Sequence, residues 1–259
     1  MVTRLPKSDP LNLTGVFRRE VPMPPGSFLS LLPDSLWSSL LTTDPGSGAP
    51  LYPVCYAKDK RLPLGPGDET VYLTLTGCVA QRRYPYGRGA KEPVILRFRG
   101  AGQLLGEAKL LDPCSSVETV CLSDTWVLPY SADHLNRLLG RRGGQGRGAL
   151  LASLEERNRT DEMIYGTVTR PPLRRVGALL HHLAVTAGTG HPDGSVRITG
   201  PRQTDLAEAL LVSRSTVENA VSVLRTGNLV ASSYRRFVVT DPAGLARLAG
   251  VPRDFRLSA

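Results

Sequence analysis

The sequence is poor in the features that mark membrane, secreted and metal-binding proteins. Its 259 residues include no stretch near the ~20 consecutive apolar residues that a bilayer-spanning helix needs. The N-terminus lacks the basic and then apolar pattern of a secretion signal. The 4 cysteines show no Cys-x-x-Cys spacing, so neither zinc nor an iron–sulfur cluster is indicated, and buried reduced thiols are expected. These absences predict a cytoplasmic protein with no membrane contact, no metal and no other cofactor.

Lysine is scarce as well, so nearly all of the positive charge comes from arginine. The formal net charge is nevertheless +9 and the sequence pI is about 9.7. An excess of this size favours a polyanionic partner, which by charge alone could be DNA, RNA or an acidic membrane surface. The abundance of Arg, Ala, Gly, Leu and Pro is typical of a GC-rich bacterial genome.

The choice of DNA comes from residues 203–224, QTDLAEALLVSRSTVENAVSVL, which have the pattern of a helix-turn-helix. Thr204 is expected to cap a first helix, Val212 to form the turn and Ser213 to cap a second helix. The second helix has an apolar stripe on one face and polar residues on the other. Such a helix fits the major groove with its first turns on base edges. We therefore predict DNA contacts from Thr204, Ser213, Arg214, Ser215, Thr216, Glu218, Asn219 and Ser222.

A short hairpin with arginines at its tip follows the second helix. Residues 231–233 and 236–239 have the pattern of two strands, and Tyr234-Arg235 that of the turn between them. Arg235 and Arg236 are expected to contact phosphates, as the wing of a winged helix-turn-helix does. A helical hairpin packed on a core would show the same capped, amphipathic pattern, and it is the wing that favours DNA binding over this alternative.

The distribution of apolar, proline and glycine residues along the chain predicts an α+β protein with four regions. Residues 1–26 carry basic residues and prolines without an apolar period and are expected to form a flexible extension. Residues 27–148 begin with two helical turns separated at Pro33-Asp34, and many short strands then predict an antiparallel β jelly roll. Residues 141–148, RRGGQGRG, predict a flexible basic break. The candidate strands are 51–57, 71–75, 78–82, 94–98, 117–122 and 125–128.

The third and fourth regions are a long helix and the winged helix-turn-helix domain. Residues 149–170 have a narrow apolar seam and no obvious partner within the chain, which is typical of a dimerisation helix. Pro171-Pro172 ends this helix, and residues 171–259 form the DNA-binding domain. The expected dimer contacts are Leu150, Leu154, Asp161, Ile164, Tyr165 and Val168.

This order of parts resembles the Crp/Fnr family of bacterial transcription regulators, from about residue 28 to about residue 248. Residues 102–107, GQLLGE, are similar to the family's phosphate-cradle turn, and residues 213–217, SRSTV, look like a family signature. The resemblance implies a β-roll sensor, a homodimer and a pseudo-palindromic DNA operator, with RNA polymerase as a further candidate partner. It places ligand contacts at Gly106, Glu107, Ser115, Ser116 and Thr160.

The sensor region departs from the members that bind cyclic nucleotides. Those members carry an arginine that neutralises the cyclic phosphate, whereas residues 114–118, CSSVE, contain none and add the carboxylate of Glu118. A buried cyclic phosphate would therefore lack a charged partner, unless the side chain of Arg97 or Arg99 extends to it. Burying a charge without a partner is costly, so we do not expect DNA binding to require cAMP. In the second helix Arg214 suits guanine and Asn219 suits adenine, so the operator should differ from that of the cyclic-AMP receptor protein.

Two other functions fit parts of the sequence. A ligand-sensing or scaffold protein could use the winged helix for protein contacts, although the polar face and the wing arginines argue against this. An enzyme could use Glu107 as a catalytic carboxylate, yet no second carboxylate or histidine is placed with it at a recognisable spacing. We therefore expect a transcription regulator rather than an enzyme.

Overall fold

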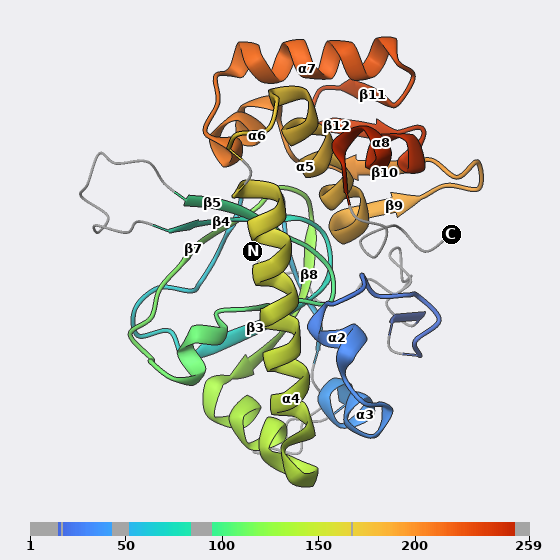
Figure 1. Ribbon diagram of the computed structural model, residues 1–259. Helices are drawn as coiled ribbons and strands as arrows, with labels where there is room; N and C mark the ends of the chain where they lie inside the picture. Colours follow the sequence, from blue (N-terminus) through green and yellow to red (C-terminus); the bar gives the residue numbers. More distant parts are fainter. Residues whose placement is uncertain (1–14, 17, 43–51, 84–94, 167, 252–259) are drawn as a thin grey trace. The chain divides into compact units, whose positions relative to one another are not determined.

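The computed structural model describes residues 15, 16, 18–42, 52–83, 95–166 and 168–251 (Figure 1). The chain falls into two compact units, of which the first comprises Met1–Arg82 and Arg99–Asn158 and the second Arg83–Phe98 and Arg159–Ala259. No helix within the described ranges is long and apolar enough to cross a membrane.

The first unit contains antiparallel sheets, as the jelly-roll prediction requires. One sheet has the strand order β1 (Val54–Tyr56), β8 (Thr125–Ser131), β3 (Thr70–Thr76), β6 (Leu104–Leu105). In another, β7 (Glu118–Cys121) lies between β2 (Arg61–Leu62) and β4 (Val79–Arg83). Each of the six predicted strands matches an observed one, although residues 51 and 94 lie outside the described residues. Strands β2 and β6 are too short for a sequence pattern and were not predicted.

Two short helices and the segment before them close one side of this unit. The break at Pro33 is confirmed, because α2 (Phe28–Leu31) ends before it and α3 (Asp34–Thr42) begins after it. Their apolar side chains join the core with β3 and β8. The prediction of a flexible extension over residues 1–26 is wrong for its end, since Val16 is fully buried in the same core and the Arg19 guanidinium lies 4.3 Å from the Trp37 ring centroid. Residues 1–14 lie outside the described residues.

The helix α4 (Ala132–Tyr165) runs through the predicted basic break without a gap. The chain nevertheless turns back within it, because Gly143 and Gly144 adopt φ angles of +71° and +80°. A Cβ atom on Gly146 would lie 2.9 Å from the Leu139 Cα atom, whereas positions seven apart in a straight helix are about 10 Å apart. The break is therefore a sharp reversal between two helical arms (Figure 1), and the second arm ends at Tyr165, before the predicted end.

The second unit contains the C-terminal domain. Its sheet has the antiparallel order β11 (Val230–Ser233), β12 (Arg236–Val239), β10 (Val196–Thr199), β9 (Gly188–Gly190). The central helix α5 (Pro172–Ala187) is almost entirely buried and packs against α7 (Arg214–Thr226) and α8 (Pro242–Ala249). The helix α6 (Gln203–Leu210) precedes α7, so the predicted order of two helices and a hairpin is confirmed. Strand β9 and helix α8 were not predicted. Strand β5 (Ile95–Arg99) also contributes residues to this unit.

Candidate nucleic-acid interface

The first helix of the pair is capped by a different residue from the one predicted. α6 begins at Gln203, and the residue before it is Arg202, so Thr204 is not the cap. The Asp205 carboxylate accepts a hydrogen bond of 2.7 Å from the Arg202 backbone N and lies 3.2 Å from its guanidinium. A carboxylate in the first turn suits the positive end of a helix, and Asp205 is buried. Thr204 instead lies exposed on the first turn of α6, where its DNA contact stays a prediction.

The turn between the helices is built on a strained residue. Leu211 has φ +52° and ψ +50°, the left-handed conformation that glycine usually provides in this motif. For a residue with a Cβ atom this conformation costs roughly 1–2 kcal/mol. The Leu211 side chain is 67% exposed, so its burial returns little of that cost.

The second helix has the cap and the faces that the sequence predicted. The Ser213 Oγ atom accepts a hydrogen bond of 3.1 Å from the Thr216 backbone N. The stripe of Val217, Ala220, Val221 and Leu224 is buried. The opposite face is exposed, with Thr216 half-buried at its edge. The exposed residues of this face are Arg214, Ser215, Glu218, Asn219 and Ser222.

The wing is tied to the rest of the domain through its backbone. Tyr234 and Arg235 form the two-residue turn between β11 and β12, and Arg235 has φ +53°. The Arg235 carbonyl accepts a hydrogen bond of 2.9 Å from the Gly200 backbone N, which holds the tip against the end of β10. Arg236 is exposed and Arg235 half-buried. Tyr234, which was predicted as part of the turn but not as a DNA contact, is 83% exposed at the tip and offers an aromatic face beside the two arginines.

The turn that resembles a phosphate cradle is in close contact with other side chains of the first unit. Gly106 has φ +82° and precedes the short helix η1 (Glu107–Leu110), and a Cβ atom there would lie 2.5 Å from the Leu64 Cδ2 atom. The Glu107 carboxylate pairs with the Arg157 guanidinium of α4, and the two side chains are only 10% and 15% exposed. Burial alone would raise the pKa of Glu107, but Arg157 and, to a smaller extent, Arg99 hold that pKa below its usual value.

The other expected ligand residues are Ser115, Ser116 and Thr160, and their ligand contacts stay predictions. Ser115 is half-buried, Ser116 is exposed, and Thr160 belongs to the second unit. Glu118 was expected to add repulsion, but its carboxylate lies 2.9 Å from the Arg61 guanidinium, which compensates its charge. A buried ammonium group near the turn was not predicted. The Lys109 Nζ atom donates to the Gly65 carbonyl at 2.7 Å.

The two arginines considered as replacements have different positions. Arg99 is buried within reach of Glu107, as its effect on that carboxyl shows. Arg97 is engaged in the second unit, where its Nε atom lies 3.6 Å from the Asp161 carboxylate and its guanidinium 3.8 Å from the Tyr165 ring centroid. Arg97 is therefore engaged by side chains of the second unit.

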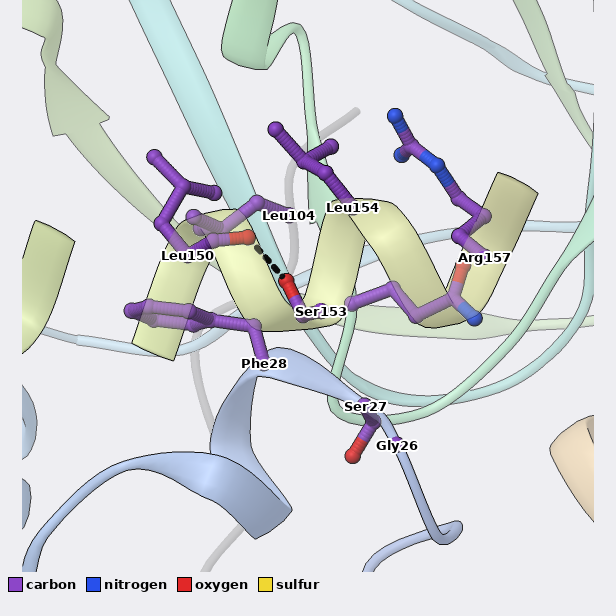
Figure 2. Close-up of a pocket in the computed structure, with 9 residues that line it drawn as sticks. Gly26, Ser27, Phe28, Leu104, Leu150, Ser153, Leu154 and Arg157 are labelled. Atoms are coloured by element: carbon purple, nitrogen blue, oxygen red, sulfur yellow. Dashed lines mark hydrogen bonds between the residues drawn. The ribbon is translucent and has the colours of Figure 1, made fainter. Parts of the chain in front are cut away.

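A small cavity in the first unit is lined by Arg157 but not by Glu107. Its volume is about 10 Å³, which is room for about one water molecule. Figure 2 shows Ser27 and Phe28 on one side of it and the α4 side chains Ser153 and Arg157 on the other. The Ser153 Oγ atom donates to the Leu150 carbonyl at 2.8 Å, so this hydroxyl is already used within α4.

The predicted dimer residues fall into two groups. Ile164 is fully buried and Tyr165 is 8% exposed within the single chain, and Asp161 pairs with Arg97, so these three leave little surface for a partner. This part of the prediction needs correction, because the same helical spacing serves burial inside one chain and between two. Val168 is exposed. Leu150 and Leu154 are half-buried.

Leu150 and Leu154 instead line an open groove of about 870 Å³ in the first unit. Leu111, which the sequence did not single out, is 93% exposed at this groove, and Leu151, which belongs to the predicted apolar seam, is 67% exposed there. Apolar exposure on this scale within one region is typical of an interaction surface. The groove is also lined by charged side chains, those of Glu107, Arg137, Arg141 and Arg147. Its leucines are Leu110, Leu111, Leu139, Leu150, Leu151 and Leu154.

Comparison with known proteins agrees with this architecture. Residues 174–248 match the Crp-like helix-turn-helix domain. A CRP-family transcriptional regulator of Thermus thermophilus is 22% identical, with a TM-score of 0.58, and the match covers 76% of this chain and 96% of that one. FixK2 from Bradyrhizobium japonicum is 19% identical, with a TM-score of 0.59 and coverage of 77% and 98%. No curated protein sequence matches the chain. The chain therefore has the fold of Crp/Fnr regulators and carries a Crp-like helix-turn-helix domain.

Proposed function

Because a Crp-like helix-turn-helix domain lies in a chain with the Crp/Fnr fold, we propose that this protein is a sequence-specific DNA-binding transcription regulator. The observation that carries the proposal is the exposed polar face of α7, which begins at the Ser213 cap and stands beside the arginine-bearing wing. A helix with this face can enter the major groove while the wing contacts the backbone.

The two sets of residues have different tasks in this proposal. Arg214 and Asn219 read base edges, because an arginine fork matches guanine and a carboxamide matches adenine. Arg235 and Arg236 bind phosphates, which fixes orientation and carries no sequence information. Thr204, Ser213, Ser215, Thr216 and Ser222 supply further hydroxyl contacts.

The regulator acts as a homodimer on a pseudo-palindromic operator. The leucine-lined groove beside α4 gives a second copy an apolar surface to cover, and Leu151 lies on it. Two-fold symmetry would present two α7 helices to half-sites about one helical turn apart. The interface is thus centred on Leu150, Leu151 and Leu154 rather than on Ile164 and Tyr165.

DNA binding does not depend on cAMP. In the proposed mechanism the Glu107–Arg157 pair links the cradle turn to α4 without any effector, since the buried carboxylate is already neutralised. A nucleotide that bound the Glu107 carboxylate would have to compete with Arg157 for it, and a buried charge left without its partner is costly.

The test is selection of duplexes from a random pool by the purified protein, followed by mobility-shift assays with and without cAMP and cGMP. We expect a pseudo-palindromic sequence that is bound without nucleotide. Failure to enrich any sequence would overturn the proposal and leave protein contacts as the role of the winged helix.

A further inference from the structure

The exposed polar face of α7 carries one carboxylate, that of Glu218. Glu218 is the only acidic residue among Arg214–Thr226, and its side chain is 43% exposed. It lies beside Asn219 on the face that the proposed function turns toward DNA. A carboxylate there is repelled by phosphates, and it weakens binding unless it does something else.

In the structure, Glu218 forms an ion pair with Arg214. The Arg214 Nε atom donates to the Glu218 Oε1 atom at 2.7 Å, across one turn of the helix. This contact uses the Nε atom of the guanidinium and neither of its two terminal nitrogens. Guanine presents O6 and N7 in the major groove, and the terminal fork of an arginine matches these two acceptors. The bond thus leaves free the part of Arg214 that can recognise guanine.

We propose that Glu218 is a positioning residue that makes Arg214 a guanine reader and so sets the sequence specificity of the protein. The inference rests on the proposed function. An arginine side chain has many rotamers, and without the carboxylate it can swing to the nearest phosphate, which is present at every DNA sequence. Glu218 therefore lowers affinity for DNA in general and raises the preference for guanine at one position of each half-site.

This role gives two effects of opposite sign when the carboxylate is removed. Glu218→Ala should bind random duplex DNA more tightly than the wild type, because one negative charge has gone and Arg214 can reach phosphates. The same variant should prefer guanine at the Arg214 position less, by about tenfold, which is within the range for loss of one bidentate base contact. Glu218→Gln keeps an acceptor for the Nε atom and should retain part of the preference.

The experiment compares variants by selection from a random duplex pool and by titration of the selected and random duplexes. Arg214→Gln identifies the guanine position, because its preference should vanish there. Glu162→Gln changes the net charge equally at an exposed site on α4, and it should behave as the wild type does. In an Arg214→Gln background, Glu218→Ala should cause no further loss of guanine preference.

The outcomes separate this inference from the function on which it rests. An unchanged guanine preference in Glu218→Ala, with the wild type still selecting a defined sequence, would overturn the positioning role alone. A wild type that selects no sequence would overturn both. Circular dichroism checks that the variants fold, which is expected because both side chains are exposed on α7.

Discussion

Removal of the buried Glu107–Arg157 pair is expected to lower the stability of the first unit by a large amount. Replacing Glu107 by glutamine keeps the shape of the side chain but leaves the Arg157 guanidinium, only 15% exposed, without its counter-charge. Arg99 lies nearby and adds a second positive charge. Breaking a buried ion pair on one side costs about 3–5 kcal/mol, so we expect the first unit to lose about that much stability.

The chain contains a convenient reporter for this measurement. Its 2 tryptophans, Trp37 and Trp126, are both buried in the first unit, so tryptophan fluorescence follows the unfolding of that unit. With a urea m-value of about 1–3 kcal/mol/M, the expected loss lowers the unfolding midpoint by at least about 1 M. Glu69→Gln is the matched control, since Glu69 is an exposed carboxylate of the same unit.

The pH dependence gives a second check with a definite sign. The folded-state pKa of Glu107 is lower than its ordinary value of 4.5, so the carboxylate contributes stability above that value and loses it as the pH falls through the folded pKa. The difference between the wild type and Glu107→Gln should be constant near neutral pH and shrink in acid.

Two results would contradict this reasoning. Exposed ion pairs contribute less than about 1 kcal/mol to stability. If Glu107→Gln lowered the free energy of unfolding by no more than this, the pair would be accessible to solvent. A double variant, Glu107→Gln with Arg157→Gln, should recover part of the stability because no charge is left unpaired. A double variant less stable than both single ones would show that the two side chains act independently.

The other predictions concern assembly, DNA contacts, the effector and the turn. Leu151→Glu should give a monomer in sedimentation, whereas Tyr52→Glu, another exposed apolar side chain, should not; a dimer in both would exclude the groove as the interface. Asn219→Ala should cost about 1–3 kcal/mol on the selected operator and little on random DNA, while Arg236→Ala should weaken both and reduce the salt slope by about 1. Calorimetry with cAMP should show no micromolar binding, and a tenfold gain in operator affinity would refute the expectation. Leu211→Asn should stabilise the second unit by roughly 1 kcal/mol in thermal unfolding, because asparagine tolerates the left-handed conformation.

Features set by near neighbours in the chain were predictable. Ser213 caps α7 through a residue three positions on, and the buried stripe of that helix follows from its own period. The turn at Tyr234-Arg235 and the break at Pro33 are local in the same sense. The N-cap of α6 was assigned to Thr204 because threonine is a common cap. In the structure the Asp205 carboxylate, one position further along, accepts a hydrogen bond from the Arg202 backbone N.

Features that depend on distant residues were not predictable from the pattern. Glu107 and Arg157 are 50 positions apart, and nothing in either segment indicates the other. The same is true of Glu118 and Arg61. The apolar seam of α4 shows which side chains are buried. It does not show whether they are buried by the same chain, as Ile164 is, or by a second copy.

The backbone hydrogen bond between Gly200 and Arg235 affects which DNA duplexes the proposed regulator can bind with high affinity. Since this hydrogen bond holds the wing tip against the end of β10, the distance from its arginines to the exposed polar face of α7 cannot adjust freely. A duplex whose groove width departs from this fixed spacing must deform to make both contacts, and the energy of that deformation depends on its sequence. For a regulator of the proposed kind, base pairs that no side chain touches would therefore still affect affinity, through the stiffness of the DNA between the contacted positions.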